Sequence, residues 1–264
     1  MRIGARTVVD VILVSVFLAP LCSAAVASGS DPFAINLAKQ FVAITTGNVP
    51  VSSYVETATI TRWLGTVYTS APGSLQGAGY FDARLDMNFT NGVTSESRGV
   101  TSGGLPVGIW SDDAGVHSVT FLNATVGTHW YFPLLSSLAR FADSTLTFNY
   151  VGEESWNGAN ALHVRVTSIA KPATQYTPAS TSSTDYYIDP QTYLLVGMAS
   201  RLHPDDGSPS DVSWEVHYSL YQQMAGVTVP AHIDEFLSGT RVLSVDVVNL
   251  EINPTIPATT FPVQ

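Results

Sequence analysis

The sequence predicts a mainly β protein of the α+β class, built on an antiparallel sheet with a few short helices. Runs rich in Val, Thr and aromatic residues recur along the chain, and turn residues separate several of them at hairpin distance. Apolar and polar residues also alternate: in the run 81–89, Phe81, Leu85 and Met87 share one side and Arg84 lies on the other. Such strands have one face in the core and one in water.

A helix is expected first, before the strands. Asp31 is an N-cap residue, Pro32 suits the first helical turn, and apolar residues follow at helical spacing until Gly47. The strand-like runs then follow in order: 54–68, 78–89, 116–122, 145–151, 161–169, 193–202, 212–221 and 241–250.

The run 212–221 shows the alternation again, because Trp214, Val216, Tyr218 and Leu220 fall on one side of it. Turn signals support hairpins between neighbouring strands. Asp189-Pro190 separates short strands at 186–188 and 193–195, and the segment 203–207 separates the next two. The Ser- and Thr-rich stretch 171–184 is expected to be a long hairpin tip without fixed structure of its own.

One internal segment interrupts the strand pattern. Pro133 is expected to open a short amphipathic helix within 130–143. Its apolar face would consist of Leu134, Leu135, Leu138, Phe141 and Ala142, and its polar face of Ser136, Ser137, Arg140 and Asp143. With Trp130, Tyr131 and Phe132 directly before it, this cluster either packs into the core or covers something.

The first 27 residues have the order of a secretory signal peptide. Arg2 and Arg6 precede an apolar run, 11–21, which is too short to span a bilayer, and small residues follow it. We predict a signal peptide over 1–27 and a single domain over 28–264, exported to the periplasm or the extracellular space. Cys22, the only cysteine, precedes the predicted cleavage site, so the mature chain would have no disulfide and no thiolate metal site.

Charge excludes some partners of the mature chain. Residues 28–264 carry nine basic and 20 acidic side chains, a net charge of −11, so nucleic acid and anionic membrane surfaces would repel them. We expect no membrane-spanning segment after signal removal. Only 12% of residues are charged, while 45% are hydrophobic. The sequence leaves the oligomeric state open.

Motifs for common chemistry are missing. The chain has no G-x-S-x-G, H-E-x-x-H, Walker or dinucleotide-binding pattern, and we expect no catalytic residues, no metal and no cofactor. Adjacent Glu153 and Glu154 would point to opposite faces of a strand. Glu215 and His217 share a face, but no third metal ligand is identifiable. Remaining weak candidates are a calcium loop (Asp205, Asp206, Asp211), single histidines (His117, His129, His163, His232) and glycosylation sequons at Asn88 and Asn123.

The order of these features, with several short motifs, resembles the superfamily of periplasmic lipoprotein carriers and their outer-membrane receptors (LolA/LolB-like). The motifs that carry the resemblance lie at 151–153, 156–158, 187–190, 193–195, 226–230 and 252–254, with Phe261. The resemblance implies a strongly curved antiparallel sheet, a half-open barrel whose hollow is covered by short helices, and a cargo of lipoprotein acyl chains. The chain departs from the carriers in its length and in the tip 171–184, and Arg62 is only a weak counterpart of their interior arginine.

In such a fold the apolar lining captures acyl chains by removing them from water. We expect a non-enzymatic binding protein for a lipid or an acylated ligand such as a lipoprotein, with a role in transport. One strand wall (Phe81, Leu85, Met87, Trp214 and Val216) and a lid (Phe132, Leu135 and Leu138) would form its ligand site. Two alternatives remain: a secreted structural or protein-interaction module of the same fold with a filled interior, and a hydrolase of unfamiliar geometry.

Overall fold

The computed structural model describes residues 29–262 apart from 48, 91, 102–105, 113, 120, 125, 169–182 and 204–209. The predicted signal peptide therefore lies outside the described residues. So do most of the hairpin tip 171–184 and the two loop aspartates Asp205 and Asp206.

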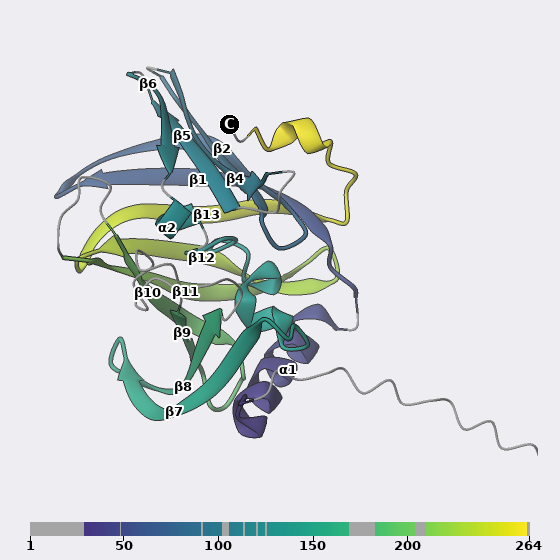
Figure 1. The fold of residues 1–264 in the computed structure, drawn as a ribbon. Helices are drawn as coiled ribbons and strands as arrows, with labels where there is room; N and C mark the ends of the chain where they lie inside the picture. Colours follow the sequence, from purple (N-terminus) through teal and green to yellow (C-terminus); the bar gives the residue numbers. More distant parts are fainter. Residues whose placement is uncertain are drawn as a thin grey trace, which may run out of the picture.

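The described strands form one antiparallel sheet (Figure 1). The strands are β1 (Ser53–Leu64), β2 (Val67–Ala78), β3 (Asp82–Phe89), β4 (Gly92–Val100), β5 (Pro106–Asp112), β6 (Gly115–Val119), β7 (Leu146–Trp156), β8 (Ala159–Ser168), β9 (Ser183–Ile188), β10 (Leu195–Leu202), β11 (Val212–Met224), β12 (Val227–Leu237) and β13 (Thr240–Ile252). Their order is β6-β5-β4-β3-β2-β1-β13-β12-β11-β10-β9-β8-β7.

This order consists of two meanders joined where β1 pairs with β13. Strands β6 and β7 lie at the two ends, so the sheet is not closed into a barrel. Figure 1 shows the sheet curving so that β7 and β8 wrap round one side of the molecule. The predicted mainly β, half-open architecture is confirmed.

Helix α1 (Pro32–Thr46) lies against one face of this sheet, which we call the inner face. Its predicted ends are confirmed: the Asp31 side chain accepts a hydrogen bond of 2.8 Å from the Phe33 amide, and Gly47 adopts the left-handed conformation that commonly ends helices. The inner face is apolar along most of its length. On β1, for example, Tyr54 and Ile60 are fully buried.

Residues 126–143, which we call the covering segment, also lie over the inner face. The predicted amphipathic helix here is wrong: the segment contains two short 3₁₀ helices, η1 (Pro133–Leu135) and η2 (Ser137–Arg140). Ser136 between them is extended, and its hydroxyl donates a hydrogen bond of 2.7 Å to the Pro133 carbonyl, so no continuous helix forms. Leu134, Leu135 and Leu138 are buried as predicted. Ala142 is exposed and Ser136 is buried, contrary to the predicted faces.

Other boundaries differ from the sequence prediction. The predicted strand 54–68 is a hairpin, because the chain turns at Gly65 between β1 and β2. Most of β2 and the whole of β4, β5 and β12 were not predicted. Leu220 does not continue the inner face of β11, since it has a positive φ of 52° and is 69% exposed. Two short helices, α2 (Phe121–Ala124) and η4 (Ala258–Thr260), complete the described elements.

Candidate functional site

The structure brings most of the predicted site residues together. Seven of them belong to one cluster of buried residues, made by the inner face of the sheet and the covering segment: Leu85, Met87, Phe132, Leu135, Leu138, Trp214 and Val216. The eighth, Phe81, lies just before β3 and is half-buried, with the Arg140 guanidinium 5.2 Å from its ring centroid. Whether this cluster receives a ligand stays a prediction.

The interior beneath the covering segment is tightly packed. The Phe132 ring stacks on Tyr54 with centroids 3.9 Å apart, and Phe132, Tyr54 and Leu138 have no exposed surface. A cavity between β3, β4 and the covering segment measures about 10 Å³, which is room for about one water molecule. An acyl chain fits this place only if the covering segment moves away from the sheet.

Individual side-chain hydrogen bonds fasten the covering segment to the sheet. The Tyr218 hydroxyl on β11 donates to the Trp130 carbonyl at 2.5 Å. The Tyr54 hydroxyl on β1 lies 3.1 Å from His129 Nδ1, and Ser137 Oγ lies 2.7 Å from the Tyr186 hydroxyl on β9. None of these contacts is part of a strand ladder, so each can break without disturbing the sheet.

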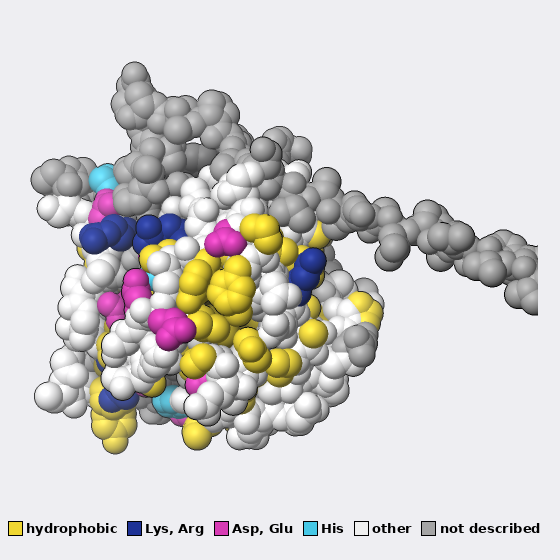
Figure 2. All heavy atoms as spheres, turned by 90° about the horizontal axis from the view of Figure 1, so that it is seen from below, with side chains coloured by type: hydrophobic (Ala, Val, Ile, Leu, Met, Phe, Trp, Pro, Cys, Tyr) yellow, Lys and Arg dark blue, Asp and Glu magenta, His cyan; other side chains and the backbone are white. Residues whose placement is uncertain are grey.

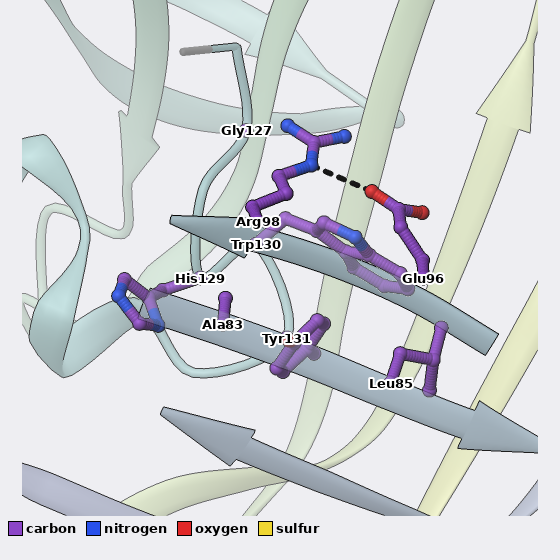
Figure 3. Close-up of a pocket in the computed structure, with 8 residues that line it drawn as sticks. All are labelled: Ala83, Leu85, Glu96, Arg98, Gly127, His129, Trp130 and Tyr131. Atoms are coloured by element: carbon purple, nitrogen blue, oxygen red, sulfur yellow. Dashed lines mark hydrogen bonds and ion pairs between the residues drawn. The ribbon is translucent and has the colours of Figure 1, made fainter. Parts of the chain in front are cut away.

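Arg98 on β4 is a further fastening and the centre of an interior ion pair. Its Nε donates to Glu96 at 2.6 Å, and its guanidinium also donates to the Val126 carbonyl at the start of the covering segment. Figure 3 shows this pair beside the small cavity, with Trp130 and Tyr131 next to it. Arg98 therefore links β4 to the covering segment.

Glu235 on β12 adds another carboxyl to this interior. It accepts a hydrogen bond of 2.7 Å from the Trp214 indole, and burial, the largest cause, raises its pKa to about 7. The charges of Glu96 and Arg98 also act on its pKa. The two halves of the curved sheet thus bring acidic groups of β4 and β12 close to each other.

Glu56 on β1 is the most deeply buried carboxyl of the inner face. It has no exposed surface, it lies opposite Leu75 of β2 and Leu250 of β13, and neither of its carboxylate oxygens has a hydrogen-bond partner. Burial raises its pKa well above the usual value of 4.5. Sequence analysis missed this residue, although the alternation of Tyr54, Glu56, Ala58 and Ile60 could have placed it on the apolar side.

Arg62, the predicted counterpart of the carriers' interior arginine, does not line the cavity between β3, β4 and the covering segment. Arg62 lies near the end of β1 with its guanidinium carbon 4.8 Å from the Phe89 ring centroid. Arg98, which sequence analysis did not single out, is the arginine beside the interior cavity.

The weak candidates for chemistry make short contacts with their neighbours in the sheet. Glu215 and His217 touch at 3.4 Å, as their shared face predicts, and Glu154 contacts His163 while Glu153 accepts from Asn160. Across the described part of the chain, no group of three or more His, Cys, Asp or Glu side chains could hold a metal ion.

An exposed apolar patch lies on the side of the molecule that α1 and β7 form. Figure 2, which views the molecule from below, shows hydrophobic side chains gathered near the middle of this face. On these elements Phe33 is 47% and Val151 45% exposed, and Phe33 packs edge-on against Tyr150 with centroids 4.7 Å apart. Within the described residues, no helix is long and apolar enough to cross a membrane.

The sequence matches no protein-family model, and no curated protein is similar to it in sequence. Solved structures nevertheless share its fold. A domain from Vibrio parahaemolyticus assigned to outer membrane lipoprotein sorting superposes with a TM-score of 0.55 at 10% identity, covering 87% of this chain and 96% of that one. A DUF1329 family protein from Desulfovibrio piger superposes with a TM-score of 0.56 at 11% identity, covering 89% and 98%.

These likenesses show that the chain shares the fold of these two proteins, as the resemblance in its motifs predicted. Identities this low show the fold alone.

Proposed function

We propose that the protein is a non-enzymatic, exported binding protein that holds a hydrophobic or acylated ligand between the inner face of its sheet and the covering segment. The observation that carries this proposal is the way the apolar interior is closed. A large apolar sheet face is covered by a segment of short 3₁₀ turns, which single side-chain hydrogen bonds fasten in place. The shared fold with a domain assigned to lipoprotein sorting supports the same class of ligand.

The free energies are compatible with opening. Burying an acyl chain contributes ~0.8 kcal/mol per CH₂, or about 12 kcal/mol for a 16-carbon chain before ordering costs. Each broken hydrogen bond of the covering segment costs about 1 kcal/mol. The chain would also replace part of the contact that Phe132, Leu135 and Leu138 make with the sheet, so binding can offset the cost of opening.

The experiment locks the covering segment to the sheet. Ser137 of η2 and Thr184 of β9 line the same cavity of about 40 Å³, so a double variant, Ser137→Cys with Thr184→Cys, can be bridged by a short bifunctional thiol reagent. In residues 28–264 these would be the only thiols, because Cys22 is the only natural cysteine. The readout is binding of a fluorescent 16-carbon fatty acid.

We expect the unbridged double variant to bind the probe and the bridged protein to lose binding. Each single-cysteine variant, treated with the same reagent, is the matched control and should keep binding. Native mass spectrometry of residues 28–264, purified from the native host without detergent, would show bound lipid or acylated peptide as mass above the polypeptide.

The packed interior favours one alternative, a secreted interaction module of the same fold that never opens. A bare polypeptide that binds no probe, bridged or unbridged, would favour this module and contradict the carrier proposal.

A further inference from the structure

The buried Glu56 carboxyl indicates which polar group the ligand carries. An isolated buried carboxyl without a hydrogen-bond partner costs free energy, and burial favours its neutral form. Unpaired groups of this kind are rare in folded proteins and cluster at functional sites. Glu56 has no exposed surface, and its charge acts on the buried Tyr131 hydroxyl, so the covering segment lies near it.

Glu56 belongs to one row of side chains that crosses four strands. The pairing register places Glu56 of β1 next to Leu75 of β2, Leu75 next to Leu85 of β3, and Leu85 next to Glu96 of β4. Leu75 is fully buried and Leu85 is 4% exposed, whereas the Glu96 side chain is 31% exposed. The row thus runs from the partly exposed Glu96 across the two leucines to the fully buried Glu56.

The interior around this row is acidic. The charges of Glu96 and Arg98 act on Glu235, and those of Glu96, Arg98 and Glu56 act on the buried Tyr131 hydroxyl. Arg98 already binds Glu96 and the Val126 carbonyl. Burial lowers the pKa of His129 to about 3, so this histidine adds no positive charge at neutral pH. A ligand carboxylate entering here would find no unengaged cation among these groups.

We propose that the ligand has an ammonium group at the polar end of its acyl chain and that the Glu56 carboxylate binds this ammonium, with the chain along Leu75 and Leu85. An ammonium has three N–H donors, so it can satisfy oxygens that now have no partner, and its charge stabilises the ionised carboxylate. This inference rests on the proposed function, because Glu56 becomes accessible only when the covering segment opens.

The experiment compares three 12-carbon probes below their micellar concentrations: dodecylammonium, dodecanoate and dodecanol. Binding is measured by calorimetry with wild-type protein, Glu56→Gln and Glu251→Gln. The last variant is the matched control, because it removes the same charge from an exposed position on β13.

We expect wild-type protein and Glu251→Gln to bind dodecylammonium most tightly. Glu56→Gln should weaken dodecylammonium by roughly 10- to 100-fold, the value of a hydrogen bond to a charged group, and leave dodecanol unchanged. Unchanged dodecanol binding also shows that the variant is folded. A lysophosphatidylethanolamine and a diacylated peptide with a free α-amine then distinguish a lipid source of the ammonium from a lipoprotein source.

Equal binding of the three probes, or an ammonium preference that persists in Glu56→Gln, would overturn the inference and leave the proposed function standing. If no probe binds wild-type protein, the proposed function fails as well.

Discussion

The Tyr218 hydroxyl offers a direct test of how the covering segment is held. It donates hydrogen bonds to the Trp130 carbonyl at 2.5 Å and to Met198 Sδ at 2.9 Å, and Tyr218 is only 5% exposed. Tyr218→Phe removes this donor without removing the ring. The loss should cost about 1 to 2 kcal/mol, the value of a buried hydrogen bond together with a partly unsatisfied carbonyl.

If this hydrogen bond stabilises the closed state of the covering segment, its loss makes opening easier by that free energy. The amide hydrogens of the segment should then exchange roughly tenfold faster, since ~1.4 kcal/mol is a factor of ten. Hydrogen exchange by mass spectrometry on peptides within 126–143 measures this, and urea denaturation measures the global change. The fluorescent fatty acid should also bind faster to this variant.

Tyr221→Phe is the matched control. Its hydroxyl donates to the Leu195 carbonyl at 2.7 Å, so it fastens the start of β10 rather than the covering segment. We expect a similar loss of global stability but unchanged exchange in 126–143. Equal exchange in the two variants would refute the idea that Tyr218 holds a separately opening cover.

Two further predictions concern stability. In Gly197→Ala the new Cβ would lie 2.2 Å from Nε1 of Trp156, whose ring stacks on Tyr187 with centroids 3.9 Å apart. The free energy of unfolding, measured by urea denaturation, should therefore fall by about 1 to 3 kcal/mol. In a Trp156→Ala background the same substitution should cost little. Glu235 is protonated in both the folded and unfolded chain below about pH 4.5, but between that pH and its folded pKa of about 7 mainly the unfolded chain ionises. Its contribution to stability should therefore fall as pH rises, by at most roughly 3 kcal/mol, and Glu235→Gln should remove this dependence in urea denaturation at pH 5 and 8; an unchanged pH profile would contradict it.

Much of the sheet could be predicted because its strands follow the two-residue period. Leu85 and Met87 on β3, and Trp214 and Val216 on β11, are buried as their alternation predicted. Strand β4 escaped prediction because its inner face has Glu96 and Arg98 where a strand normally has apolar residues. Pro230 obscured β12, since proline is unusual inside a sheet.

The covering segment shows the limit of helical periodicity. Leu134, Leu135 and Leu138 are spaced as on one face of an α-helix, and their burial was predicted correctly. The extended Ser136 nevertheless divides the segment into two 3₁₀ turns. Contacts with strands distant in sequence, such as those made by Tyr54 and Tyr218, accompany this path and have no local signal.

The sequence by itself determined the local features: the Asp31 cap, the strand periodicity, and many of the apolar residues that form the core. Only the tertiary structure decided that Glu56, Glu96, Arg98 and Glu235 share an acidic interior. The physical reason is that alternation assigns a side chain to one face of its own strand, whereas burial and pKa depend on neighbouring strands and on the curvature of the sheet. The pairing of β1 with β13, which joins the two halves, connects residues at opposite ends of the described chain.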